Sequence, residues 1–174
     1  MFVNYIKTRT HTWFAGRQAN AHEDMEKFVW GRITWFMFHI MAEKIKPEFF
    51  AIARKYLLEF VTQISYNLPC PICSEHARRN LSRVNLNHIK TKEDFKYFIF
   101  AFHNKVNVDT NKPVESLDVL EKYATGNLDK IIEIFIYVHN HESYSNKLMM
   151  RKHMKNKVIK DFVGWYTTNK FMFA

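Results

Sequence analysis

The residues of this chain best suited to chemistry are its only two cysteines, Cys70 and Cys73, which lie in the sequence PCPIC at residues 69–73. Pro69 disfavours helix just before Cys70, and Pro71 suits the first turn of a helix, where the missing N–H is not needed. We therefore expect Cys70 at a helix N-terminus and Cys73 one turn further on. The free N–H groups and the positive end of the helix dipole favour a thiolate there. Such a pair can be attacked at one sulfur and resolved by the other.

A single CxxC pair has three interpretations: a redox pair, half of a zinc site, or an inert pair of thiols. Zinc prefers four ligands. Because the chain has no second cysteine pair, a zinc site would need Cys70, Cys73 and two histidines, and His76 could be one of them. Two cysteines this close cannot staple a fold, so unless the pair is inert its role lies in its reactivity. The neighbouring segments decide which interpretation is favoured.

The composition favours a helical protein with one hydrophobic core. The chain has 174 residues, of which 47% are apolar and 16% aromatic, with four glycines and four prolines. Leu, Ile, Met and Phe recur at spacings of three and four, as they do on the buried faces of helices. No uncharged run approaches the roughly 20 residues of a membrane span, and Lys7, Arg9 and His11 interrupt any secretory signal. We therefore expect an all-α, soluble, intracellular protein.

The net charge of +9 is typical of contact with nucleic acid or with an acidic partner. No nucleic-acid motif accompanies the charge, so we favour a basic surface over nucleic-acid binding. Residues 146–170 carry many lysines against a single acid, Asp161, and predict a basic helix that ends near Gly164. We interpret this segment as the solvated face of an added helix. The alternative is a contact for an acidic partner, nucleic acid or a second subunit.

Hydrophobic spacing predicts where the other helices lie. They are expected at residues 23–46, 47–66, from Cys70 to near Val84, around 95–107, and at 128–139. Thr91 and Asp94 predict a capping box before the fourth of these. The apolar stripe of the second helix consists of Phe50, Ala53, Leu57, Phe60, Val61 and Ile64.

Two of these helices carry side chains that could contact a ligand. Trp35 and His39 share a face of the first helix, where the pattern alone favours a core aromatic and a satisfied core histidine over a ligand site. His103 and Asn107 lie one turn apart on the fourth helix and suit hydrogen bonds to a polar ligand. Lys112 follows that helix and adds a cation.

Three segments together resemble the Erv/ALR family of sulfhydryl oxidases. Residues 30–39 (WGRITWFMFH) resemble its GRxxWxxxH segment, and residues 69–73 resemble its PCxxC active site. Residues 103–107 (HNKVN), followed by Lys112 and Pro113, resemble its flavin-binding segment HNxVN and KP. Tyr123 stands where the family often has an aromatic residue. The resemblance runs from about residue 30 to residue 123.

The resemblance implies a fold and a cofactor. Members of the family form a four-helix bundle with a short fifth helix, hold FAD at the mouth of the bundle, and are mostly homodimers. We accordingly expect an N-terminal extension (1–22), an FAD-binding bundle (23–126) and a basic helical C-terminal extension (127–174). In the FAD site, a lysine suits phosphate, and histidine and asparagine suit ribose and adenine edges. The residues that would contact FAD are Gly31, Arg32, Trp35, His39, Cys73, His76, His103, Asn104, Val106, Asn107, Lys112 and Tyr123.

The resemblance also implies a reaction. A substrate thiolate would attack Cys70 of the oxidised pair, Cys73 would leave beside the flavin, and a second substrate thiol would release the product disulfide. Electrons would pass from Cys73 to FAD and then to molecular oxygen, giving hydrogen peroxide. The alternative function is a non-enzymatic helical module, with or without zinc, that binds an acidic partner.

The cysteine count bears on the partner. The chain lacks the second, shuttle CxxC of the commoner cellular members, and in this it resembles the short enzymes of large DNA viruses. We therefore expect Cys70 to react directly with a thiol-containing partner protein of the CxxC or thioredoxin-like type. A viral source would place the protein in the host cytoplasm or the virion.

Overall fold

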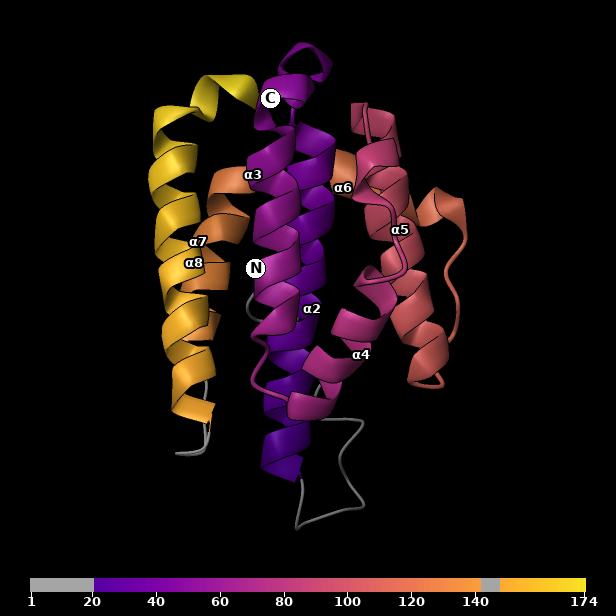
Figure 1. The fold of residues 1–174 in the computed structure, drawn as a ribbon, viewed down its shortest axis with the longest axis vertical. Helices are drawn as coiled ribbons and strands as arrows, with labels where there is room; N and C mark the ends of the chain where they lie inside the picture. The colour runs from indigo at the N-terminus through magenta and orange to yellow at the C-terminus, as the bar shows by residue number, and fades with distance from the viewer. Residues whose placement is uncertain (1–20, 142–147) are drawn as a thin grey trace.

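The computed structural model describes residues 21–141 and 148–174, with side chains from residue 29 onward (Figure 1). The described part is built of α-helices, which confirms the predicted all-α class. Of the predicted N-terminal extension, residues 1–20 lie outside the described residues. The α-helices are α2 (Ala21–Lys44), α3 (Pro47–Tyr66), α4 (Pro71–Leu81), α5 (Lys92–Asp109), α6 (Glu121–Ala124), α7 (Leu128–Asn140) and α8 (Met149–Thr168). Short 3₁₀ helices are η1 (Leu86–His88), η2 (Leu117–Leu120) and η4 (Lys170–Met172).

The helices share one core. α2 packs against α5, α6 and α7, whereas α3 packs against α4 and α8, so that α7 and α8 cover one flank and α4 and α5 the other (Figure 1). The ring of Phe60 on α3 stacks on Phe162 of α8, with centroids 3.9 Å apart. The predicted apolar stripe of α3 is confirmed, since each of its members is buried: Phe50, Ala53, Leu57, Phe60, Val61 and Ile64.

Local signals set the starts of the helices. Pro47 occupies the first turn of α3, as predicted. The predicted capping box is confirmed, because the Asp94 N–H donates to Thr91 Oγ1 at 3.1 Å and the Thr91 N–H donates to Asp94 Oδ2 at 2.9 Å. The N–H groups of Lys90 and Thr91 hold the pKa of the Asp94 carboxyl below its usual value. These bonds satisfy N–H groups that the first turn leaves without helical partners.

Two predicted helix ends were wrong. α4 ends at Leu81 rather than near Val84, because the Arg83 and Val84 N–H groups bond to the carbonyls three residues back and close the helix as a tight turn. α8 continues past Gly164 to Thr168. A helical glycine costs about 1 kcal/mol, which is offset here because Trp165 stacks on Tyr56 with centroids 5.1 Å apart.

The end of the chain is fixed to the turn between α2 and α3. The Lys46 N–H donates to the Met172 carbonyl at 2.8 Å, and the Ala174 N–H donates to the Lys44 carbonyl at 2.7 Å.

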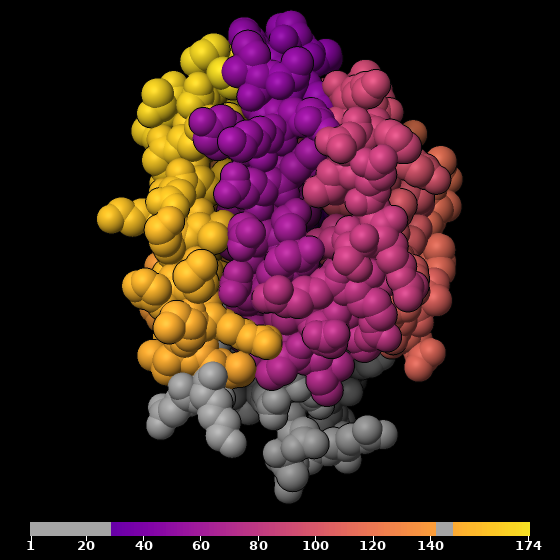
Figure 2. All heavy atoms as spheres, viewed as in Figure 1, coloured from indigo at the N-terminus to yellow at the C-terminus, as the bar shows by residue number. Residues whose placement is uncertain are grey.

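In the space-filling view, α8 fills one side of α3 while the α4–α5 pair fills the other (Figure 2). The two flanks of α3 therefore lie against other helices, whereas its outward face, which includes Ile52 and Tyr56, is exposed.

Candidate active site

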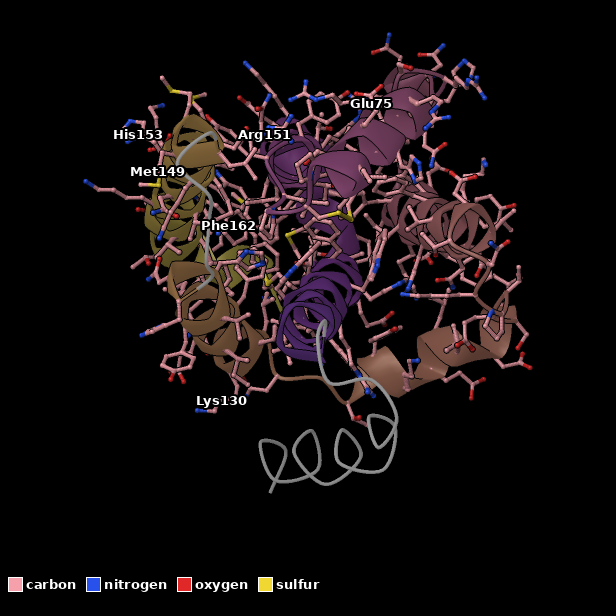
Figure 3. The ribbon with its side chains drawn as sticks, turned by 90° about the horizontal axis from the view of Figure 1, so that it is seen from below. Glu75, Lys130, Met149, Arg151, His153 and Phe162 are labelled. Atoms are coloured by element: carbon pink, nitrogen blue, oxygen red, sulfur yellow. A yellow bond between two sulfur atoms is a disulfide. The ribbon has the colours of Figure 1, made fainter. Side chains whose placement is uncertain are left out.

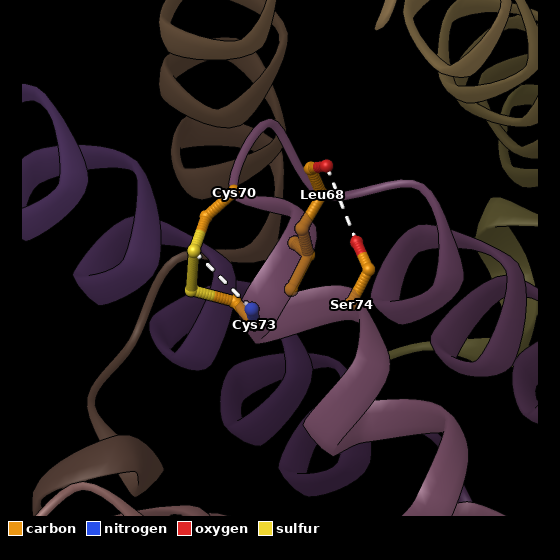
Figure 4. Close-up of a disulfide and its surroundings, with 4 residues drawn as sticks. All are labelled: Leu68, Cys70, Cys73 and Ser74. Atoms are coloured by element: carbon orange, nitrogen blue, oxygen red, sulfur yellow. Dashed lines mark hydrogen bonds between the residues drawn. A yellow bond between two sulfur atoms is a disulfide. The ribbon is translucent and has the colours of Figure 1, made fainter.

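Cys70 and Cys73 form a disulfide at the start of α4, with their Cα atoms 5.2 Å apart (Figure 4). Cys70 is the N-cap of the helix, as predicted, and its Sγ accepts a hydrogen bond from the Cys73 N–H at 3.2 Å. Pro71 occupies the first turn. Both sulfurs are half-buried, and the disulfide lies among α2, α4 and α5 in the end-on view (Figure 3). A thiolate on Cys70 would keep this N–H bond and lie at the positive end of the α4 dipole.

A buried serine fixes the segment that carries the disulfide. The Ser74 hydroxyl donates to the Leu68 carbonyl at 3.2 Å, and the Ser74 N–H donates to the Cys70 carbonyl at 3.0 Å (Figure 4). Ser74 is fully buried. These two bonds tie the chain before the disulfide to the helix after it. The orientation of Cys70 relative to Cys73 is therefore set by the helix rather than by a loose loop.

Four of the predicted site residues form one aromatic cluster. Trp35 and His39 come from α2, His103 from α5 and Tyr123 from α6. Trp35 stacks on His103, with centroids 4.1 Å apart and planes within 9°. His39 stacks on Tyr123, with centroids 4.3 Å apart and planes within 4°. His39 Nε2 and His103 Nδ1 lie 3.1 Å apart and share one hydrogen bond.

Both imidazoles of this cluster are neutral at neutral pH. Burial, followed by the charges of His103 and Lys122, lowers the pKa of His39 from 6.5 to about 3. Burial, followed by the charges of Lys122 and Lys112, lowers the pKa of His103 to about 4. Burial also raises the pKa of Tyr123 to about 12, so its phenol stays protonated. A neutral imidazole carries one donor and one acceptor, which suits the polar edge of a heterocyclic ligand.

Cations border the cluster on the side of α6. Lys122 Nζ lies 5.0 Å from the centre of the Tyr123 ring, and burial lowers the pKa of this ammonium. The half-buried Arg32 guanidinium lies 5.7 Å from the centre of the Phe36 ring. The Lys112 charge acts on His103. Flat aromatic faces next to cationic groups are what a dinucleotide such as FAD requires, because its rings stack and its pyrophosphate is anionic.

Asn107 supports the same fit to FAD. Its side chain is 8% exposed, and no hydrogen bond joins it to another protein group in the described part of the chain. The amide atoms of Asn107 are not among the fully buried polar atoms that lack a partner, so they are open to water and could bond to a ligand instead. The Asn107 carbonyl accepts the Lys112 N–H at 2.8 Å, and Asn111, with φ of 53°, turns the chain between them. The unpartnered amide and the cation are therefore held close together.

The other predicted site residues have varied surroundings. The Asn104 side chain both donates to and accepts from the backbone of Glu115, at 2.9 and 3.0 Å, and so anchors the loop that carries Lys112. Val106 packs half-buried against the core. A Cβ on Gly31 would meet no atom within 4 Å, so packing does not require glycine there. His76 lies on α4, one turn beyond Cys73.

The sequence comparison gives this site its context. The model of the Erv1 / Alr family matches residues 32–125, which include the disulfide and all four rings of the cluster. The chain belongs to the Erv1 / Alr family. The family recognised from its motifs in the sequence is thereby confirmed. α7 and the whole basic C-terminal segment lie outside the matched residues.

Individual proteins with similar sequences are consistent with this family assignment. It is 30% identical to protein 096R of Invertebrate iridescent virus 3 over 97 residues, which are 55% of this chain and 66% of that protein. It is 32% identical to an FAD-linked sulfhydryl oxidase of African swine fever virus over 110 residues, 60% of this chain and 87% of that one. The match to the FAD-linked sulfhydryl oxidase ERV1 of Oryza sativa is 30% over 84 residues, 48% of this chain and 43% of that one. No solved structure shows significant similarity to the chain.

Three residues in or beside the Erv1 / Alr site were not predicted from the sequence: Lys122, Asn80 and Asp109. Lys122 lies beside Tyr123 in the chain but carries no motif of its own. Asn80 Nδ2 donates to Asp109 Oδ2 at 2.8 Å, and this bond ties α4 to α5. Asp109 also accepts from Lys105, and these two hydrogen bonds lower the pKa of its carboxyl. No local pattern marks a contact between residues 29 positions apart.

The described residues also bear on metal and membrane binding. Within residues 21–141 and 148–174, no three His, Cys, Asp or Glu side chains gather as metal ligands. No helix in the described ranges has the length and apolar character needed to cross a membrane. Zinc binding by Cys70 and Cys73 was one of the interpretations that the sequence left open. In the structure these two cysteines form a disulfide with each other.

Proposed function

We propose that this chain catalyses the FAD-linked oxidation of protein thiols through the Cys70–Cys73 disulfide. The observation that carries the proposal is the disulfide at the N-terminus of α4, in a chain whose matched region also contains the neutral aromatic cluster. Two relatives that match this region are named FAD-linked sulfhydryl oxidases. FAD, when bound, supplies the two-electron acceptor that reoxidises the cysteine pair and delivers the electrons to oxygen, which becomes hydrogen peroxide.

The thiol chemistry is assigned to the two sulfurs by their places on α4. A substrate thiolate attacks Cys70 Sγ, which forms a mixed disulfide and releases Cys73 as a thiolate. A second substrate thiolate then attacks the substrate sulfur of the mixed disulfide, which releases the product disulfide and Cys70 as a thiolate. The Cys73 N–H, 3.2 Å from Cys70 Sγ, stabilises that departing charge.

Cys73 is the sulfur that we assign to the flavin side. With about 3.6 residues per turn, Cys73, His76 and Asn80 share one face of α4. Asn80 is bonded to Asp109 of α5, so this face is directed toward α5. Pro71 and Ile72, on another face, are exposed. The FAD contacts proposed for His103, Asn107 and Lys112 come from α5 and the loop after it, on the side of α4 to which Cys73 belongs.

The proposal extends to the partners. Because the whole chain contains only two cysteines, it has no shuttle pair, and the substrate protein is proposed to be a CxxC or thioredoxin-like protein that meets Cys70 directly. A homodimer follows from the family resemblance and stays a prediction that light scattering can test.

The deciding experiment is to purify the protein and measure its colour, FAD content and oxygen consumption with dithiothreitol. We expect a yellow protein with one FAD per chain that consumes oxygen and produces peroxide. Cys70→Ser should retain FAD and lose dithiol oxidation, because the attacked sulfur is gone while the aromatic cluster is intact. A colourless protein with stoichiometric zinc would instead favour the non-enzymatic module. Full activity in Cys70→Ser would refute the thiol mechanism.

A further inference from the structure

The residues next to the attacked sulfur form an unusual surface. Ile72, between the two cysteines, has 69% of its surface exposed, and Pro71 beside it is exposed too. Because Ile72 is only two positions after Cys70, a protein that presents a thiol to Cys70 brings its surface close to this apolar side chain. Such an exposed branched residue has no role in the core, and an exposed apolar residue at a reaction site fits contact with a partner.

Two arginines continue this surface along α4. Arg79 lies seven positions after Ile72, and Arg83 four positions after that, so the three fall on one stripe of the helix and its closing turn. At about 1.5 Å per residue, Arg79 lies about 10 Å along the axis from Ile72. We name Ile72, Arg79 and Arg83 the α4 stripe. Glu75 is the one acid of α4, and it points outward from the helix (Figure 3).

Both arginines of the α4 stripe are exposed and have no side-chain partner within the described residues. The neighbouring Arg78 differs, because it donates to the Tyr66 carbonyl at 3.0 Å and lies 4.5 Å from the centre of the Tyr66 ring. Some exposed lysines elsewhere are paired with acids, such as Lys157 with Asp161 at 3.1 Å, whereas others, such as Lys160, have no ion pair in the described part of the chain. The α4 stripe therefore offers two unsatisfied guanidinium groups beside the disulfide.

We propose that the α4 stripe is the docking surface for the substrate, and that it selects thiol proteins with acidic side chains about 10–15 Å from the reactive cysteine and an apolar residue next to it. The proposal rests on the thiol oxidase function. Guanidinium groups bind carboxylates in a bidentate manner. The net charge of +9 also steers acidic partners toward the chain.

The test compares two reduced CxxC peptides of equal length, one with an acidic and one with a basic segment beyond the cysteines. The measured quantity is kcat/KM for each peptide, divided by that for dithiothreitol, which is too small to span the α4 stripe. The variants are Arg79→Glu and Ile72→Ser. The control is Lys160→Glu, an exposed residue of α8 with the same change of charge.

The wild type and Lys160→Glu should prefer the acidic peptide at low salt. Since an exposed ion pair contributes up to about 1 kcal/mol, Arg79→Glu should lower the acidic-peptide ratio about threefold to tenfold and favour the basic peptide. Salt at about 0.5 M should abolish the difference. Ile72→Ser should lower both peptide ratios together and keep the preference.

Two outcomes would overturn the proposal. One is an equal peptide preference in Arg79→Glu and Lys160→Glu, which would mean that the net charge alone steers the substrate. The other is no loss with either peptide in Ile72→Ser, together with unchanged preference in Arg79→Glu. Failure of the wild type to oxidise dithiothreitol is a separate result, because it would remove the oxidase function itself.

Discussion

Replacement of Phe162 by alanine tests whether the C-terminal helices belong to the same folding unit as the FAD site. Phe162 lies on α8, outside the residues that match the Erv1 / Alr family, and it is 6% exposed. Its ring stacks on Phe60 of α3 at 3.9 Å and lies 6.2 Å from Tyr166. If α7 and α8 form a separate extension, their loss should leave the FAD site intact. If they share the core, loss of Phe162 should weaken both.

The expected cost follows from the burial. Truncation of a buried phenylalanine to alanine typically costs about 3–5 kcal/mol, because transfer energy is lost and a cavity remains. For a chain of this length, 1 kcal/mol corresponds to about 2–4 °C in the melting temperature. We therefore expect Phe162→Ala to melt about 6–20 °C lower. The same substitution at Phe171, which is 58% exposed, should cost less than about 1 kcal/mol and serves as the matched control.

Two probes make the measurement decisive. Far-UV circular dichroism reports the helices, and flavin fluorescence reports release of FAD from the site. We expect both midpoints to fall together in Phe162→Ala and to stay near the wild type in Phe171→Ala. If only part of the helical signal melted early and FAD release stayed at the wild-type temperature, α8 would be an independent unit, and the shared core would not stabilise the site.

Three further predictions concern the site itself. In Cys70→Ala, the free Cys73 thiolate beside oxidised flavin should give a long-wavelength absorption band that fades on acidification; a band in Cys73→Ala instead would reverse the assigned roles. Lys112→Ala should weaken FAD binding about tenfold to a hundredfold in a fluorescence titration, whereas unchanged affinity would remove this cation from the site. The pKa values of His39 and His103 fall from 6.5 to about 3 and about 4 on folding, so as the pH is lowered the unfolded chain takes up protons before the folded chain does. The free energy of unfolding of the FAD-free protein should therefore not depend on these histidines above about pH 6.5. Below that pH it should fall by up to about 1.4 kcal/mol per pH unit for each histidine. Urea unfolding of the wild type and of a His39→Gln, His103→Gln variant at pH 7 and 5 checks this, and equal losses in the two proteins would contradict it.

Local chemistry explains which parts of the fold could be predicted. Prolines and the capping box act within one turn of the chain, so the starts of α3, α4 and α5 followed from the residues there. The end of α8 did not, because Trp165 reaches Tyr56 in another helix, and that contact outweighs the helix-breaking tendency of Gly164.

The same distinction applies to the site. The motifs identified Trp35, His39, His103 and Tyr123, and the structure brings all four together. Which ring stacks on which depends on how α2, α5 and α6 interlock, and no spacing within one helix contains that information. Asn104 is an example in the other direction. An amide near a helix end can bond to a nearby loop as readily as to a ligand, and in this structure its partner is the Glu115 backbone.

The basic segment at residues 146–170 shows why composition misleads about exposure. Its charge predicts a solvated face, and Lys157 and Lys160 are indeed exposed. Lys155, on the same helix, is fully buried, and its ammonium donates to the His139 carbonyl at 2.7 Å. His139 Nε2 lies 2.9 Å from Thr34 Oγ1, so polar contacts continue from α8 through α7 to α2. A lysine buried in this way is costly unless its Nζ is hydrogen-bonded, so α8 must dock where the His139 carbonyl can accept that bond. This requirement specifies how α8 docks more strictly than apolar packing would, and it connects the C-terminal segment to the helix that carries Trp35 and His39.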